Sequence, residues 1–177
     1  QMTEAEQPAP NDTPDDQAPA APAKSVNRAG ARSSARLAAV QALYQHDMES
    51  TPVAKLLHEF HQHRLGSTID DEEFDDAAYA QAEVDFFDDL VRGTIARLPD
   101  VDAAIAEKLS TGWSLTRLEK AMKAVLRVGT YELIGRADVP APAAISEYVD
   151  VAKAFHSAKE AGFVNGLLDA VAKGAGR

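Results

Sequence analysis

Three arginines, Arg28, Arg32 and Arg36, stand four residues apart near the start of the chain. On a helix, this spacing places them on one face at steps of about 6 Å, close to the spacing of phosphates in extended single-stranded RNA. No Asp or Glu occurs between Gln17 and His46 to neutralise them. Because Lys and Arg bind nucleic acids largely by neutralising phosphates, the pattern predicts an RNA-binding strip. A solvated helix face is the alternative interpretation.

A second candidate for chemistry lies at residues 58–63, with the sequence HEFHQH. The zinc-binding motif His-Glu-x-x-His places its histidines at i and i+4, with the glutamate as general base. Here His58 and His61 are at i and i+3, so the glutamate is misplaced and the geometry of the motif is lost. We therefore predict solvent-facing histidines and no metal site.

The rest of the sequence lacks catalytic signatures. It contains no phosphate-binding loop, no Gly-x-Gly-x-x-Gly and no recognisable Ser, His and Asp order. It has no cysteine, which excludes disulfides and thiolate nucleophiles. The acids of residues 70–76 could hold Mg²⁺, but such runs are more typical of solvated loops. We predict a protein that is not an enzyme and needs no cofactor.

The net charge of −10 is unevenly distributed along the chain. Residues 69–89 contain ten acids and no Lys or Arg, whereas the segment with the three arginines contains no acid. Fields of exposed charges decay within about 10 Å at ordinary salt concentrations. An acidic protein can therefore still bind phosphate at a local basic strip.

The pattern of apolar residues predicts an all-α fold. Apolar residues recur at helical spacing, and no segment shows the alternation of a strand. Residues 1–27, rich in Pro, Ala, Asp and Gln, are predicted to be a disordered tail, and residues 28–177 to form one helical domain. About seven helices are expected, near residues 31–48, 52–65, 76–95, 99–109, 116–134, 145–155 and 161–172.

The first helix should bury one apolar stripe. Leu37, Val40, Ala42 and Tyr44 supply that stripe. In the last helix, Gly166 is expected to permit close packing against a neighbour. These residues would fix how the first and last helices lie on the core.

The helix near residues 116–134 is the most apolar and should be central, with Leu126 in the core. Thr116 and Glu119 have the spacing of a capping box at its start. Trp113, in the turn before it, is expected to be a core residue or a turn anchor. No apolar run reaches the length of a membrane span, and no apolar signal region precedes the domain, so a cytoplasmic location is expected.

Four segments, in one order, resemble the family of the transcription antitermination factor NusB. They are residues 32–45 (RSSARLAAVQALYQ), 124–133 (AVLRVGTYEL), 138–147 (DVPAPAAISE) and 163–169 (FVNGLLD). The resemblance covers about residues 28–173. It implies an all-helical fold of two small packed sub-bundles.

The resemblance also implies partners. The arginine-rich first helix of the family binds the boxA element of nascent ribosomal RNA, together with ribosomal protein S10, and the heterodimer joins the elongating RNA polymerase. By position, Arg28, Arg32 and Arg36 would contact the RNA, and Asp138 and Asn165 are further RNA-binding candidates. Asp138 could instead form a turn or cap, and Asn165 could cap a neighbouring helix.

Two other functions stay open at this point. A similar domain precedes the catalytic domain of ribosomal RNA cytosine methyltransferases, but that enzyme needs a cysteine nucleophile that this chain lacks. Some members of the family also self-associate, so the chain could be a helical dimerisation module without an RNA role. Measuring boxA RNA binding with and without S10 would separate these possibilities.

Overall fold

A computed structural model describes residues 23–63 and 74–177 of the chain. These residues form seven α-helices and one short 3-10 helix, without a strand among them. The predicted all-α fold is confirmed. The elements are α1 (Ala23–Glu49), α2 (Val53–His63), α3 (Phe74–Ala96), α4 (Leu98–Lys108), η1 (Leu115–Arg117), α5 (Lys120–Gly135), α6 (Ala141–Phe155) and α7 (Ala158–Gly174).

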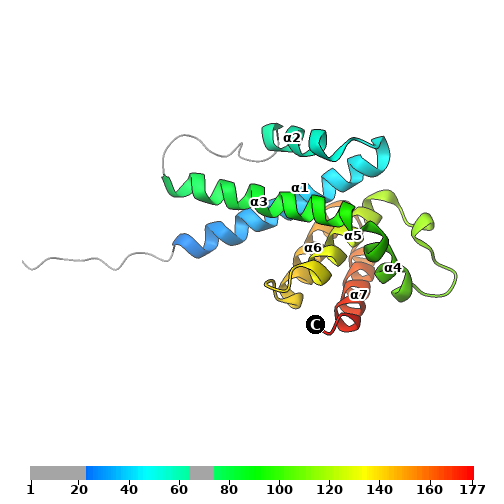
Figure 1. Cartoon of the computed structure of the whole chain (residues 1–177). Coiled ribbons are helices and arrows are strands. Elements are labelled where there is room, and N and C mark those ends of the chain that lie inside the picture. Colours follow the sequence, from blue (N-terminus) through cyan, green and yellow to red (C-terminus); the bar gives the residue numbers. More distant parts are fainter. Residues whose placement is uncertain (1–22, 64–73) are drawn as a thin grey trace, which may run out of the picture.

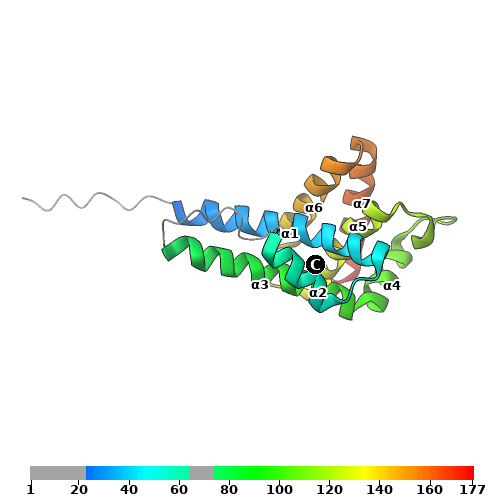
Figure 2. The ribbon, with the colours of Figure 1, turned by 90° about the horizontal axis from the view of Figure 1, so that it is seen from above.

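The helices pack as two groups that meet at α5. Helices α1 and α3 lie side by side, and α2 packs against both (Figures 1 and 2). Helices α4, α6 and α7 pack around α5, which also contacts α1 and α3. The two expected sub-bundles are therefore present, and α5 is the element through which they are joined.

Helix α5 is central because most of its length is apolar. It buries residues on all sides, and Leu126 is fully buried, as predicted. The predicted capping box at Thr116 and Glu119 is wrong: residues 115–117 form η1, and the extended backbone of Leu118 ends that turn before α5 begins. A capping box does occur at the start of α7, between Ser157 and Glu160.

Helix α1 begins earlier than the sequence indicated. It starts at Ala23, directly after Pro22, so five residues of the expected disordered tail are helical. Proline has no backbone N–H and is tolerated only in or before the first helical turn, which explains why the helix reaches back to this point. Residues 1–22 lie outside the described part of the chain.

The apolar stripe expected on α1 is only partly buried. Val40 and Ala42 belong to the core, but the side chains of Leu37 and Tyr44 are 37% and 41% exposed. These two residues are seven positions apart, which is about two helical turns, so they share a partly exposed face of α1. That expectation was wrong for both of them.

The glycine expected to permit close packing does not do so. A Cβ atom at Gly166 would meet no atom within 4 Å, whereas one at Gly93 would lie 2.0 Å from the ring of Tyr131. The close approach between helices is therefore at Gly93, where α3 meets α5.

Trp113 is 58% exposed and is not a core residue. No helix within residues 23–63 and 74–177 has the length and apolar character needed to cross a bilayer.

Candidate nucleic-acid interface

Arg36 lies inside the protein and not on its surface. Only 4% of the residue is exposed, and its Nε donates to Glu132 Oε1 at 2.9 Å while Nη2 donates to Oε2 at 3.0 Å. The expectation that Arg36 faces solvent is therefore wrong, and its guanidinium is held by Glu132 where the sequence predicted an RNA contact. Its position on α1 faces α5, and a buried carboxylate needs a partner of opposite charge.

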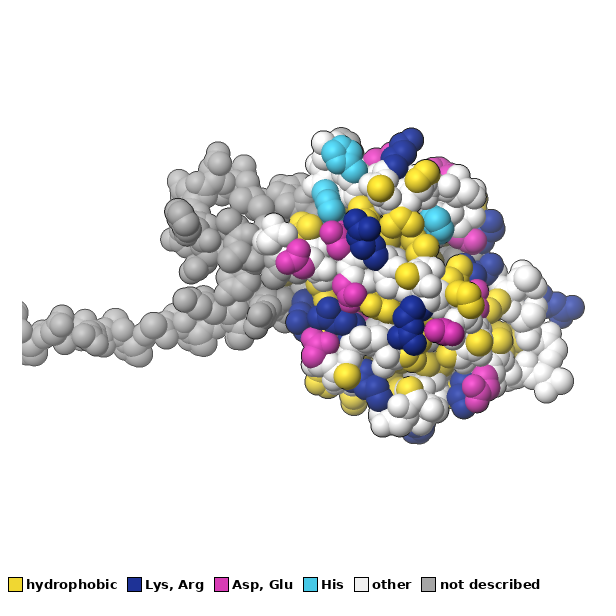
Figure 3. Space-filling view, viewed as in Figure 1, with side chains coloured by type: hydrophobic (Ala, Val, Ile, Leu, Met, Phe, Trp, Pro, Cys, Tyr) yellow, Lys and Arg dark blue, Asp and Glu magenta, His cyan; other side chains and the backbone are white. Residues whose placement is uncertain are grey.

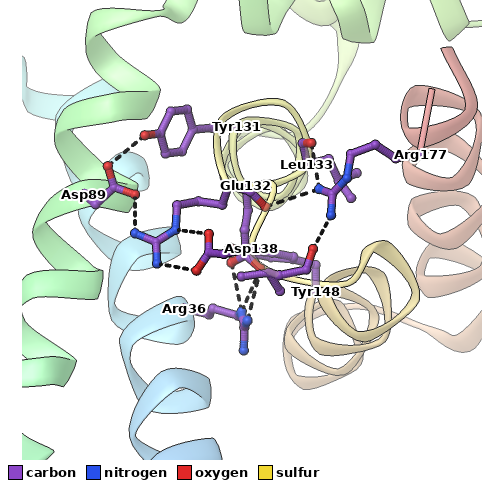
Figure 4. Close-up of polar contacts among 10 residues, drawn as sticks. Arg36, Asp89, Tyr131, Glu132, Leu133, Asp138, Tyr148 and Arg177 are labelled. Carbon is purple, nitrogen blue, oxygen red and sulfur yellow. Dashed lines mark hydrogen bonds and ion pairs between the residues drawn. The ribbon is translucent and has the colours of Figure 1, made fainter. Parts of the chain in front are cut away.

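A third buried group contacts the pair of Arg36 and Glu132. The hydroxyl of Tyr148, on α6, donates to Glu132 at 2.9 Å, so the cluster joins α1, α5 and α6 (Figure 4). Burial alone disfavours a charged guanidinium, but the hydrogen bond and charge of Glu132 outweigh it and raise the pKa of Arg36. Burial beside the Glu132 carboxylate raises the pKa of Tyr148 well above its usual value.

Next to this cluster, the ring of Phe86 is surrounded by guanidinium groups. The guanidinium carbons of Arg32, Arg36 and Arg136 each lie 5.1 Å from the centre of the ring. The ring itself is buried, with 4% of Phe86 exposed. Cations at this distance are attracted to the negative face of an aromatic ring. Phe86 on α3 therefore holds arginines from α1 and from the end of α5 in one place.

Arg32 is the arginine of this group that can bind an external anion. Its side chain is partly exposed, and no carboxylate among the described residues lies within ion-pair distance of it. Arg32 is close enough to Asp138 for its charge to lower the pKa of that carboxyl. The basic strip predicted from the sequence is thus reduced, in the described part, to one available arginine.

Arg136 lies between two carboxylates. Its Nη1 donates to Asp89 at 3.1 Å and its Nη2 donates to Asp138 at 3.1 Å, while its Nε lies 3.1 Å from the other oxygen of Asp138 without a hydrogen bond to it. Tyr131 donates to the other oxygen of Asp89 at 2.8 Å. Burial, followed by this hydrogen bond, raises the pKa of Tyr131 to about 12. Partial desolvation works against ionisation of Asp138, but the bond to Arg136 outweighs it and lowers the pKa of that carboxyl.

The other predicted site residues are not all brought together. Arg28 lies within α1, but its side chain is outside the described part of the structure. Asp138 lies beside Arg136 and Arg32, as described above. Asn165 is exposed on α7 and lines a groove between α6 and α7 together with Pro142 and Ile145. None of the arginines around Phe86 lines this groove, so Asn165 belongs to a different surface.

Charges of both signs alternate on one face of the molecule. On the face shown in Figure 3, Lys and Arg side chains lie among Asp and Glu side chains and do not form one continuous basic patch. The acids of residues 69–73 lie outside the described part of the chain. A phosphate that approaches this face therefore meets carboxylates as well as cations.

The histidine segment is engaged within the protein. His58 is exposed, as predicted, but His61 is partly buried, with its Nε2 bonded to Asp88 and its ring against Phe87 at 6.0 Å. The side chain of His63 is outside the described residues. Within the described ranges there is no group of three His, Cys, Asp or Glu side chains placed to hold a metal ion.

Three residues of this region were missed by the sequence analysis: Phe86, Glu132 and Arg136. For Glu132 a signal existed, because it is the single acid in the helix that was predicted to be central. Ionised residues are almost never fully buried without a partner. That isolated acid could have indicated a buried basic partner, and Arg36 stood on the first helix to supply it.

The geometry can be compared with known proteins. A family model described as the NusB family matches residues 33–173. The transcription antitermination protein NusB of Sphingopyxis alaskensis is 63% identical over 146 residues, which are 82% of this chain and 95% of that protein. The solved structure of NusB from T. maritima has a TM-score of 0.66 and 31% identity, covering 80% of this chain and 90% of that one.

A further solved structure contains the antitermination factors NusB and NusE in complex with dsRNA. Its matching chain has a TM-score of 0.67 and 24% identity, covering 82% of this chain and 98% of that one. At this identity the likeness concerns the fold. With the family model matching most of the chain and a relative 63% identical over nearly its whole length, this protein belongs to the NusB family.

Proposed function

We propose that this protein is a transcription antitermination factor that binds the boxA element of ribosomal RNA transcripts together with ribosomal protein S10. The observation that carries the proposal is Arg32. It stands on α1 beside Phe86, partly exposed and without an ion pair in the described residues. An arginine of this kind gains most from an external phosphate, because charge-assisted hydrogen bonds to phosphate are strong and specific in geometry.

The proposed mechanism is assembly and not catalysis. Arg32, with Arg28 one turn earlier on α1, neutralises RNA phosphates, and S10 binds another face of the helical domain. Asp138 remains a predicted residue of the surface that carries Arg32, and Asn165 remains a predicted RNA-binding residue on a separate surface. Arg36 acts from within, because its buried pair with Glu132 fixes the angle at which α1 leaves the core. The complex then joins the elongating RNA polymerase in the cytoplasm.

The names of the relatives, and the partners in one solved complex, support this proposal. The protein from Sphingopyxis alaskensis, with which this chain shares 63% identity, carries the name of a transcription antitermination protein. A structural neighbour was solved with NusE, which is ribosomal protein S10, and RNA. These names belong to those proteins, and the RNA surface proposed for this chain depends on its own Arg32.

The test is an RNA-binding titration of Arg32→Ala with S10 present, across a series of salt concentrations. Losing one phosphate contact on a single strand should reduce the slope of log K against log salt by about 0.7. The matched control is Arg117→Ala, which removes the same charge from the exposed turn η1, at the opposite end of the domain from the start of α1 (Figure 1). An unchanged affinity and slope for Arg32→Ala would overturn the proposal.

The same titration separates the alternatives. A dimerisation module without an RNA role would show self-association in sedimentation and no preference for boxA over a scrambled RNA. An accessory domain of a methyltransferase would bind RNA with an affinity that S10 does not change. The proposed factor binds boxA preferentially, and S10 increases its affinity.

A further inference from the structure

Arg136 is held by two carboxylates that differ in exposure. The side chain of Asp89 is 35% exposed and that of Asp138 is 57% exposed, while that of Arg136 is 25% exposed. Asp89 is fixed from behind by the hydroxyl of Tyr131. Asp138 is bonded to no tyrosine hydroxyl and stands at the solvent side of the guanidinium. Figure 4 shows Asp89 and Asp138 on separate sides of the guanidinium that lies between them.

The two ion pairs should therefore differ in strength. Exposed pairs contribute little, because water and salt screen them and the side chains lose freedom in forming them. The Asp138 pair is of this kind: Nη2 of Arg136 donates to Asp138 at 3.1 Å, while the buried Nε lies 3.1 Å from the other carboxylate oxygen without a hydrogen bond to it. Arginine also binds phosphate through charge-assisted hydrogen bonds. The exposed carboxylate thus occupies the Nη2 donor that a phosphate would use.

Arg136 lies close to the arginine already proposed to bind RNA. The guanidinium carbons of Arg32 and Arg136 are both 5.1 Å from the centre of the Phe86 ring. Their separation is at most twice this distance, about 10 Å, so one RNA strand can reach both. The inner partner Asp89 would keep Arg136 in place when Asp138 leaves.

We propose that Arg136 is a second phosphate-binding residue of the RNA surface, and that Asp138 occupies its Nη2 donor in the free protein until an RNA phosphate displaces it. This inference rests on the proposed function, since it places the second contact on the same RNA strand as Arg32. Asp138 then limits RNA affinity: a phosphate must compete with a carboxylate of the protein itself.

The test is a double-mutant cycle of Asp138→Ala and Arg136→Gln, measured as boxA RNA affinity with S10 present. Asp138→Ala should raise the affinity about two- to fivefold, the equivalent of losing a partly exposed ion pair. Arg136→Gln should lower the affinity and reduce the salt slope by about 0.7. In the Arg136→Gln background, Asp138→Ala should give no gain, because the donor it frees is absent.

A matched control removes a similar charge elsewhere. Asp150→Ala takes away a carboxylate that is 70% exposed and paired with Lys153 at 4.0 Å on α6, and it should leave the affinity unchanged. If the gain from Asp138→Ala persists without Arg136, the carboxylate acts only through general repulsion of RNA, and the inference is overturned. An equal gain from Asp150→Ala would overturn it in the same way.

The outcome does not depend on the stability of the Arg136 variant. Asp138→Ala alone, with a folded circular dichroism spectrum, overturns the inference if its RNA affinity does not rise. The proposed function is judged separately by wild type and Arg32→Ala. If wild type binds boxA and Arg32→Ala weakens it while the cycle shows no coupling, only the inference fails. If wild type does not prefer boxA, both fail.

Discussion

Replacing Arg36 by alanine should strongly destabilise the fold, although the sequence alone suggested an exposed residue. The change leaves Glu132, which is fully buried, with Tyr148 as its remaining hydrogen-bond donor from a side chain. A carboxylate in that position must either keep a charge without a cation or take up a proton on folding. Both outcomes raise the free energy of the folded state.

The magnitude follows from the burial of the pair. Removing one partner of a buried ion pair costs about 3–5 kcal/mol, because the other charge stays uncompensated. For a domain of this size, each kcal/mol lowers the midpoint of thermal unfolding by roughly 2–4 °C. The expected loss is therefore roughly 6–20 °C. It is far larger than the loss from Arg32→Ala, whose side chain is partly exposed and lacks an ion pair in the described residues.

Urea denaturation of wild type, Arg36→Ala and Arg32→Ala measures the difference directly. The double variant Arg36→Met and Glu132→Leu should recover much of the loss, since apolar residues of similar volume often replace a buried pair without cost. A free energy of unfolding within about 1 kcal/mol of wild type for Arg36→Ala would refute the reasoning. It would mean that the pair is open to water in solution.

Three further outcomes are expected. Gly166→Ala, with no atom within 4 Å of the new Cβ, should stabilise α7 by up to about 1 kcal/mol, whereas Gly93→Ala, whose Cβ would lie 2.0 Å from the Tyr131 ring, should cost about 1–3 kcal/mol in urea denaturation. Leu126→Ala should cost about 2–5 kcal/mol, and a near-neutral result would place the core elsewhere. With its pKa raised to about 12 in the folded chain, Tyr131 contributes stability that is complete below about pH 10 and lost as the pH rises through about 12. Tyr131→Phe should therefore flatten the alkaline fall of the thermal midpoint.

The fold was largely predictable because helix formation and burial leave periodic patterns. The order of the helices, the central place of α5 and the burial of Leu126 followed from apolar spacing alone. Helix ends were less accurate, as at Thr116 and Glu119, because a capping box requires a backbone conformation that two side chains do not determine. The start of α1 was placed too late because a tail rich in Ala and Pro was judged as a whole, although its last residues follow Pro22 and can be helical.

The site was only partly predictable, for a reason that the arginines make clear. Residues at i and i+4 on a helix differ by about 40° in direction, so a stripe of three drifts around the helix. Over the eight residues from Arg28 to Arg36, the drift is about 80°. This rotation is enough to turn Arg36 from the surface toward α5, where its guanidinium bonds to Glu132. The spacing of the arginines predicts that they share one face of α1, but the packing of α1 against α5 determines which of them are buried.

The buried pair and the proposed RNA surface share one structural element, the ring of Phe86. Arg36 lies at the ring from within the core, and Arg32 and Arg136 lie at the same distance from it at the surface. Because α1 is fixed to α5 through Glu132, the position of Arg32 relative to Arg136 depends on that buried contact. The two surface arginines come from segments about a hundred residues apart in sequence, so local structure alone cannot set their separation. The buried ion pair therefore sets the relative positions of the two proposed phosphate-binding arginines, at the cost of desolvating two charges in the core.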